Sequence, residues 1–242
     1  MKTIEEFANR IICGDNLNVM PDIPDNSIDL VITSPPYNLG YNRKHHTGNK
    51  EHCPYPDNIK ESEYQDWQIA VLNELYRILK PHGSLLYNHK NRIAKGRTIT
   101  PYQWILKTPF IVKQEIVWFN GSQNFDKCRF YPMTERIYWL SKNITTGFFN
   151  HINHHDMFNM SEWHPVGTRG EHTRAFPEQM CIDVLKCFPD ANIILDPYMG
   201  WGTTAIACIK TGRKYIGIEL DAGYVEIAEK RIKETNQQLT MF

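Results

Sequence analysis

Short apolar blocks along this chain alternate with stretches in which apolar residues recur at helical spacing. Residues 28–32 and 84–88 form apolar runs with the length of buried strands, and apolar positions recur every three or four residues over 62–79. Ser62 is a suitable N-cap for that helix, and the Pro-His-Gly sequence at 81–83 would end it. The pattern therefore predicts a strand, a helix and a second strand in that order.

The same alternation continues toward the C-terminus and defines the fold class. Further strands are predicted at 11–13, 113–119, 137–140, 193–195 and 215–218, and further helices at 16–20, 100–107, 177–188, 203–211 and 222–235. Strands that alternate with helices form a mostly parallel sheet with helices on both faces. We expect an α/β fold with a doubly wound sheet in one domain, 1–242, within which 120–175 forms a small appended lobe.

Composition supports a globular protein and limits the partners that bulk charge can attract. Hydrophobic residues make up 41% of the chain and aromatic residues 12%, and no apolar stretch approaches the roughly 20 residues that span a bilayer. The N-terminus has no signal-peptide core, so we expect a soluble cytoplasmic protein with no membrane partner. The formal net charge is zero, so any nucleic-acid binding must come from a local basic surface.

Cysteine and histidine usage gives no indication of a metal site. The six cysteines are scattered without a C-x-x-C pair, which favours free buried thiols over a disulfide framework or a zinc site. Two polar segments are rich in histidine, and we interpret both as loops: His45, His46, His52 and Cys53 in the first, and His151, His154 and His155 in the second.

Directly after the predicted strand at 28–32 comes the segment Ser34-Pro35-Pro36-Tyr37. The two proline rings fix the backbone and offer no N–H, so the segment presents carbonyl acceptors between a hydroxyl group and an aromatic ring. Such a rigid clamp suits a flat ring that carries an amine. The alternative is a turn that ends the strand and leaves the tyrosine facing solvent.

A second constellation lies between the predicted strand at 193–195 and the helix that follows it. Asp196 ends the strand, and Gly200 and Gly202 allow positive φ and close approach of a ligand. Glu219, at the end of the next strand, suits two ribose hydroxyls. The segment has neither G-x-G-x-x-G nor G-K-[ST], so it suits a ligand with a ribose and a cationic amine, such as S-adenosylmethionine, whose amine Asp196 can pair. The alternative is a tight turn without a ligand.

Together these segments resemble the amino-methyltransferases of DNA. The family's [DNS]-P-P-[YFW] motif matches 34–37, and its D-P-F-x-G-x-G-T motif matches 196–203, with Tyr198 in place of Phe. Asp15 resembles the family's early carboxylate near the cofactor adenine. The stretch 172–177 resembles the segment that opens the helix before the cofactor motif, although Thr173 replaces the usual proline. The catalytic motif precedes the cofactor motif, which is the permuted order of the β group.

The resemblance implies a Rossmann-like methyltransferase fold and a direct transfer of the methyl group of S-adenosylmethionine to the exocyclic amine of a flipped-out base. The implied catalytic residues are Ser34, Pro35, Pro36 and Tyr37, with the Ser34 hydroxyl and Pro35 carbonyl accepting from the amine and Tyr37 stacking on the base. The implied cofactor-binding residues are Asp15, Phe176, Asp196, Tyr198, Gly200, Gly202, Thr203 and Glu219. The predicted DNA contacts are Asn38 and the basic segment Lys90, Arg92, Lys95 and Arg97, whose alternative reading is a solvated loop.

The target base and the partners follow only from the resemblance. Ser34, together with Phe176 and Pro177, resembles the cytosine-N4 subgroup, and N6 of adenine is the alternative. An inactive nucleic-acid-binding module that keeps the cofactor fold is the alternative from another class. A homodimer and a cognate restriction endonuclease, as in restriction–modification pairs, both stay open.

Overall fold

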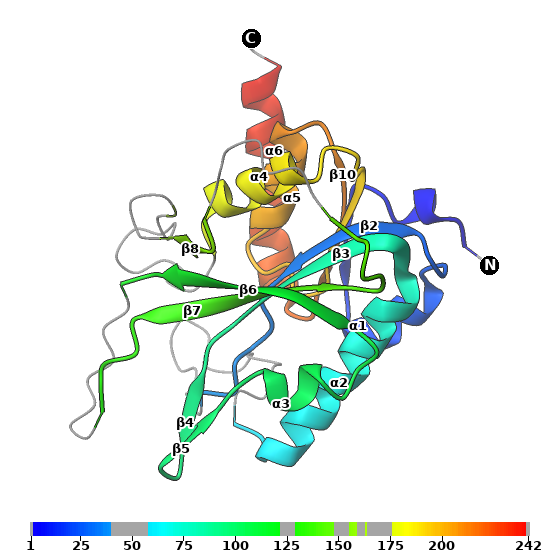
Figure 1. The fold of residues 1–242 in the computed structure, drawn as a ribbon. Helices are drawn as coiled ribbons and strands as arrows, with labels where there is room; N and C mark the ends of the chain where they lie inside the picture. Colours follow the sequence, from blue (N-terminus) through cyan, green and yellow to red (C-terminus); the bar gives the residue numbers. More distant parts are fainter. Residues whose placement is uncertain are drawn as a thin grey trace.

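An eight-stranded sheet forms the centre of the molecule (Figure 1), which we describe from a computed structural model over residues 2–39, 58–121, 129–147, 155–158, 163 and 176–240. Its strand order is β1-β10-β9-β2-β3-β7-β6-β8. The first five strands in that order are parallel: β1 (Arg10–Cys13), β10 (Lys214–Glu219), β9 (Ile193–Asp196), β2 (Ile28–Thr33) and β3 (Leu79–His89). β7 (Thr134–Ser141) runs antiparallel to β3 and to β6 (Ile111–Phe119), and β8 (Met157–Phe158) pairs parallel to β6.

Helices cover both faces of this sheet, as the sequence predicts. On one face lie α1 (Asn16–Val19), α2 (Glu61–Ile78) and α3 (Tyr102–Ile105), and on the other lie α4 (Glu178–Cys187), α5 (Thr203–Lys210) and α6 (Ala222–Leu239) (Figure 1). Two short 3-10 helices, Ile4–Glu6 and Met20–Asp22, complete the N-terminal part. The expected doubly wound α/β fold is confirmed, with an antiparallel extension at one side.

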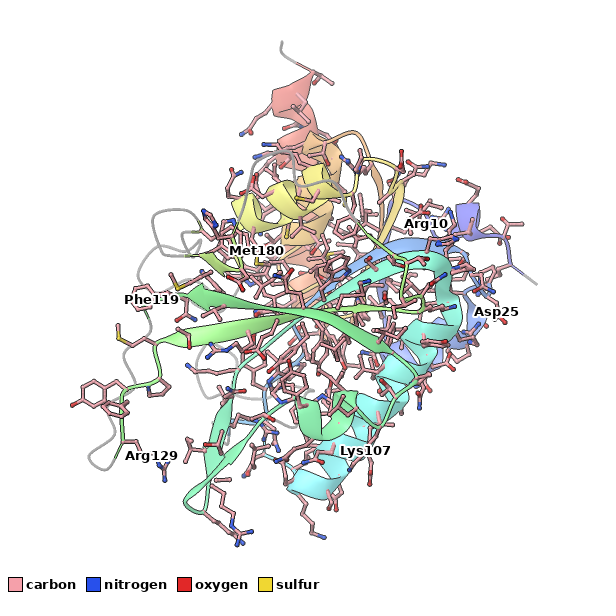
Figure 2. The ribbon with its side chains drawn as sticks, viewed as in Figure 1. Arg10, Asp25, Lys107, Phe119, Arg129 and Met180 are labelled. Carbon is pink, nitrogen blue, oxygen red and sulfur yellow. The ribbon has the colours of Figure 1, made fainter. Side chains whose placement is uncertain are left out.

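Side chains on the two faces of the sheet form two hydrophobic cores, and an irregularity in β2 between Ile28 and Leu30 directs these two residues to opposite faces. In β2, Ile28 and Val31 pack into the core beneath α2, whereas Leu30 and Ile32 pack into the core beneath α4 and α5. Side chains fill the space between the sheet and both helix layers (Figure 2). Full burial of one such aliphatic side chain stabilises the fold by roughly 1.5–3 kcal/mol, so central strands with two apolar faces anchor the sheet.

Two predicted boundaries around α2 are wrong. The N-cap is Lys60 rather than Ser62, and the helix ends at Ile78 without needing the Pro-His-Gly sequence. β3 begins directly at Leu79, because Leu79 pairs with Ile28 of β2 and draws the chain into the sheet. Strand pairing, rather than the Pro-His-Gly sequence, therefore sets the end of this helix.

The basic segment after β3 has regular structure, unlike the solvated loop of its alternative interpretation. It forms a separate two-stranded hairpin of β4 (Arg92–Ala94) and β5 (Arg97–Ile99). Lys95 and Gly96 connect the strands with φ values of 47° and 79°. Two central residues with positive φ are typical of a type I′ turn, the connection that matches the twist of a tight hairpin.

Some predictions fall mainly outside the described residues. The proposed lobe at 120–175 is described only at 120–121, 129–147, 155–158 and 163, so it stays a prediction. The histidine-rich segments lie outside the described residues except for His155. Within the described ranges, no helix is long and apolar enough to cross a membrane, and no group of three His, Cys, Asp or Glu side chains could hold a metal.

Candidate active site

The carboxyl ends of the five parallel strands meet at one edge of the sheet, and the two sequence motifs meet there. The Thr33 hydroxyl, at the end of β2, donates a 2.8 Å hydrogen bond to Asp196 Oδ1 at the end of β9. Thr33 directly precedes Ser34, and Asp196 opens the glycine-containing turn before α5. Segments 163 residues apart in the sequence therefore form one site.

The Ser34 hydroxyl belongs to a network that the sequence does not reveal. Ser34 Oγ and the Tyr37 hydroxyl are 2.7 Å apart, and the Tyr37 hydroxyl donates to Glu135 Oε2 at 2.9 Å. Asn88 Nδ2 donates to the Tyr37 hydroxyl at 2.8 Å and to Glu135 Oε2 at 3.0 Å. Asn120 Nδ2 donates to the other oxygen, Glu135 Oε1, at 2.8 Å. The network joins the ends of β2, β3, β6 and β7.

The ring of Tyr37 and the proline backbone rest on a buried histidine. The Tyr37 and His89 ring centroids are 4.6 Å apart, and the Tyr64 hydroxyl lies 2.7 Å from both His89 Nε2 and the Pro36 carbonyl oxygen. Burial lowers the pKa of His89 to about 3, so its imidazole is neutral near pH 7. Burial and the neighbouring Glu135 raise the pKa of Tyr37 well above its ordinary value, so its hydroxyl keeps its proton. The clamp is therefore a fixed structure rather than a solvent-facing turn.

Asp196 has three hydrogen-bond partners within the protein, and its predicted pairing with a cofactor amine stays a prediction. It is 1% exposed, and its carboxylate accepts hydrogen bonds from the Thr33 hydroxyl, the Thr204 hydroxyl and the Tyr198 backbone N–H. Burial raises its pKa to about 6, against the lowering effect of those three donors. Asp196 holds the turn together: its Oδ1 accepts two of these hydrogen bonds and its Oδ2 accepts one.

Glu219 keeps acceptor capacity for a ligand. Its Oε2 accepts from the Gly200 N–H at 2.8 Å and its Oε1 from the Asp221 N–H at 2.9 Å, and burial raises its pKa. An ionised carboxylate oxygen can accept more than one hydrogen bond. Each oxygen of this carboxylate, which is 2% exposed, therefore has a lone pair for one further hydrogen bond, the number that the predicted contact with two ribose hydroxyls requires.

The two glycines of the turn are needed for different reasons. Both have positive φ, 51° at Gly200 and 78° at Gly202. Among the described residues, a Cβ at Gly200 would meet only the Tyr198 carbonyl oxygen, at 3.9 Å, whereas a Cβ at Gly202 would lie 3.0 Å from Cβ of Ala228 in α6. Within the described part of the chain nothing crowds Gly200, so a ligand could approach its backbone, and Gly202 permits close packing of α6 on the turn.

The remaining predicted cofactor residues surround the same edge. Asp15 caps α1 by accepting from the Leu17 N–H, and the neighbouring Asn16 donates to the Pro197 carbonyl at 3.2 Å. Tyr198 and Thr203 are buried in and just after the turn. Phe176 is buried too, in the core beneath α4 and α5. The structure thus gathers Asp15, Tyr198 and Thr203 at the turn, and it gives Phe176 a packing role.

Three of the five predicted DNA contacts are engaged inside the protein. Arg92 is 6% exposed and forms a bidentate ion pair with Glu61, at 2.7 and 2.9 Å, and Lys90 is 8% exposed. The Asn38 side chain both donates to and accepts from the Ile59 backbone, each at 3.0 Å. Side chains that are buried or paired in this way stabilise the local structure. The structure therefore gives no support to a DNA contact by these three residues.

Lys95 and Arg97 are exposed on the β4–β5 hairpin, with no ion pair to any other described residue. They retain the predicted availability to DNA. A third basic residue, Arg129, lies in the segment that leads into β7, and Figure 2 labels it together with Phe119 at the end of β6.

Glu135 and Asn88 are the residues that sequence reasoning missed. Glu135 lies 98 residues from Tyr37, and it appears in the sequence as an ordinary polar residue before the apolar run at 137–140. The only signal was its position at a strand end, and the antiparallel pairing of β7 with β3 that brings it to the site was not predicted.

Comparisons with known proteins agree with this geometry. A family model described as DNA methylase matches residues 28–230. The type II methyltransferase M.BglII of Bacillus subtilis is 26% identical in an alignment of 259 positions that covers 93% of this chain and 69% of that protein. The type II methyltransferase M.HinfI of Haemophilus influenzae is 29% identical in an alignment of 259 positions that covers 96% of this chain and 70% of that protein.

Solved structures show the same fold. PvuII DNA methyltransferase, described as cytosine-N4-specific, superposes with a TM-score of 0.71 at 22% identity, covering 94% of this chain and 91% of that one. A Thermus thermophilus protein described as a candidate DNA modification methylase, solved in complex with S-adenosyl-L-methionine, has a TM-score of 0.68 at 22% identity and 94% coverage of both chains. Since the family model spans most of the sequence and both motifs lie at one edge of the sheet, the chain belongs to the DNA methylase family.

Proposed function

We propose that this chain transfers the methyl group of S-adenosylmethionine to the exocyclic N4 of a cytosine in DNA. The observation that carries the proposal is the Thr33–Asp196 hydrogen bond, which places the Ser34–Tyr37 clamp beside the glycine-containing turn. One motif can hold an amine and the other can hold a methyl donor, and transfer requires the two to be adjacent and aligned.

The turn and its neighbours suit S-adenosylmethionine, which when bound supplies an electrophilic methyl group on its sulfonium. Glu219 has acceptor capacity for the ribose hydroxyls, and Gly200, which donates to Glu219, is uncrowded by the other described residues. Asp15 and Asn16 border the same turn from α1. Asp196 fixes the turn through its bonds to the Tyr198 N–H and the Thr204 hydroxyl, and it would also pair with the ligand's amine.

The clamp suits the amine of a flipped-out base. Because the lone pair of an aromatic amine is delocalised into its ring, acceptors for its N–H groups favour the pyramidal form that attacks the methyl group. The Ser34 hydroxyl and the Pro35 carbonyl would be those acceptors, and the Tyr37 ring, supported by His89, would stack on the base. Stacking contributes about 1–3 kcal/mol, comparable to the few kcal/mol that base flipping costs.

The choice of cytosine rests on Ser34, since the adenine-N6 members of this permuted group more often carry Asp at that position; N6 of adenine is the alternative. The direct test is to incubate the protein with labelled S-adenosylmethionine and mixed-sequence DNA, digest the DNA to nucleosides, and identify the methylated base by mass. N4-methylcytosine is the expected product. N6-methyladenine would contradict the target base, and unmodified DNA would favour the inactive binding module.

Replacing Tyr37 with alanine tests the clamp separately from the cofactor site. The variant should lose DNA methylation because the base loses its stacking partner, while its affinity for S-adenosylmethionine, measured by calorimetry, stays near that of the wild type. Methylation at the wild-type rate by Tyr37→Ala would refute the assigned role of the clamp.

A further inference from the structure

Glu135 is the only carboxylate in the described part of the chain that hydrogen-bonds the Tyr37 hydroxyl. Its two oxygens accept from three side chains, Tyr37, Asn88 and Asn120. We propose that Glu135 is a positioning residue that acts through Tyr37 to turn the Ser34 hydroxyl, so that the lone pairs of Ser34 Oγ face the target amine. The inference rests on the proposed function and adds a residue to it.

The direction of each hydrogen bond at Tyr37 follows from counting hydrogens. A carboxylate has none to donate, so the single phenolic hydrogen must go to Glu135 Oε2, 2.9 Å away. The contact of 2.7 Å between the Tyr37 hydroxyl and Ser34 Oγ can then form only if Ser34 is the donor. Asn88 Nδ2, which also has only hydrogens to offer, fills the remaining lone pair of the phenol oxygen.

This assignment has a direct consequence for the chemistry at Ser34. With its hydrogen directed to Tyr37, Ser34 Oγ has two lone pairs left and no hydrogen to donate elsewhere. An amine N–H needs such an acceptor. A Ser34 hydroxyl that instead pointed its hydrogen at the amine nitrogen would occupy the lone pair that must attack the methyl group.

Glu135 is itself held in place from two other elements. Asn88 lies in β3, and Asn120 directly follows β6. Hydrogen bonds to an ionised group are stronger and shorter than neutral ones, so a carboxylate fixes the phenolic hydrogen more firmly than a neutral acceptor would. The orientation of Ser34 is thus determined by the pairing of β7 with β3 and β6.

The test compares methylation kinetics of Glu135→Gln in the wild-type and the Ser34→Ala backgrounds. In the wild-type background kcat should fall about tenfold, with KM for DNA within about twofold, because the amide is neutral and offers an N–H in place of one oxygen. In the Ser34→Ala background the same change should leave kcat within about twofold, because no hydroxyl remains to be oriented.

Glu115→Gln is the matched control. Glu115 lies on the neighbouring strand β6 and pairs with Arg136 at 2.8 Å, and it should leave kcat unchanged. Tyr37→Phe keeps the ring but removes the bridging hydroxyl, so it should reproduce the Glu135→Gln loss and add nothing to it in the double variant. If circular dichroism shows that Glu135→Gln does not fold, Tyr37→Phe tests the same inference in its place.

Two results would overturn the inference while the proposed function stands: wild-type kcat in Glu135→Gln, or an equal loss of kcat in the Ser34→Ala background. A wild-type protein that methylates no DNA would overturn the proposed function and, with it, this inference.

Discussion

Replacing Thr33 with valine would break the contact that joins the two halves of the site. Valine has nearly the shape of threonine but cannot donate to Asp196 Oδ1, which the Thr33 hydroxyl contacts at 2.8 Å. A hydrogen bond to a buried charged group contributes about 1.5–3 kcal/mol. Asp196 Oδ1 would still accept from the Tyr198 N–H at 3.1 Å. We therefore expect the free energy of unfolding to fall by an amount near the lower end of that range, about 1.5 kcal/mol. For a chain of this length that corresponds to a fall in Tm of roughly 3–6 °C.

Thr204→Val is the matched control, because the Thr204 hydroxyl donates to the other oxygen, Asp196 Oδ2, at 2.8 Å. Thr204→Val should lower the free energy of unfolding in urea by at least as much as Thr33→Val does. It should reduce DNA methylation less than Thr33→Val, since Thr204 does not connect the turn to the Ser34 segment. An unfolding free energy of Thr33→Val within about 0.5 kcal/mol of the wild type, or equal losses of methylation in both variants, would refute the reasoning.

Three further predictions concern packing, DNA contact and pH. Gly202→Ala should destabilise the protein by about 1–2 kcal/mol in urea unfolding, because φ is 78° and the new Cβ would lie 3.0 Å from Ala228; wild-type stability would contradict this. The double variant Lys95→Ala/Arg97→Ala should bind DNA more weakly and with a flatter salt dependence, at an unchanged Tm. An unchanged salt dependence would show that the hairpin does not contact DNA. Because the pKa of Asp196 is raised to about 6 when folded, the folded state binds this proton more tightly than the unfolded chain, so this group's contribution to stability rises as pH falls from about 7 to 4. Asp196→Asn should remove that rise, and an identical pH profile for variant and wild type would contradict the assignment.

The sequence by itself determined the alternation of strands and helices and the identity of the two motifs. Central strands such as β2 are apolar on both faces, so their pattern is strong and local. The Ser34–Tyr37 clamp and the turn at 196–203 are likewise continuous segments whose chemistry can be recognised from consecutive residues. For these features the neighbouring residues supply the relevant physical information.

The tertiary structure alone decided which side chains act together at the site. Asp196 became the anchor of the turn because Thr33 and Thr204 reach it from separate elements, and Arg92 became buried because Glu61 lies opposite it. Glu135 joined the clamp only through the antiparallel insertion of β7 beside β3. Hydrogen bonds between residues far apart in the chain depend on strand order and register, which the local pattern of apolar and polar residues does not specify.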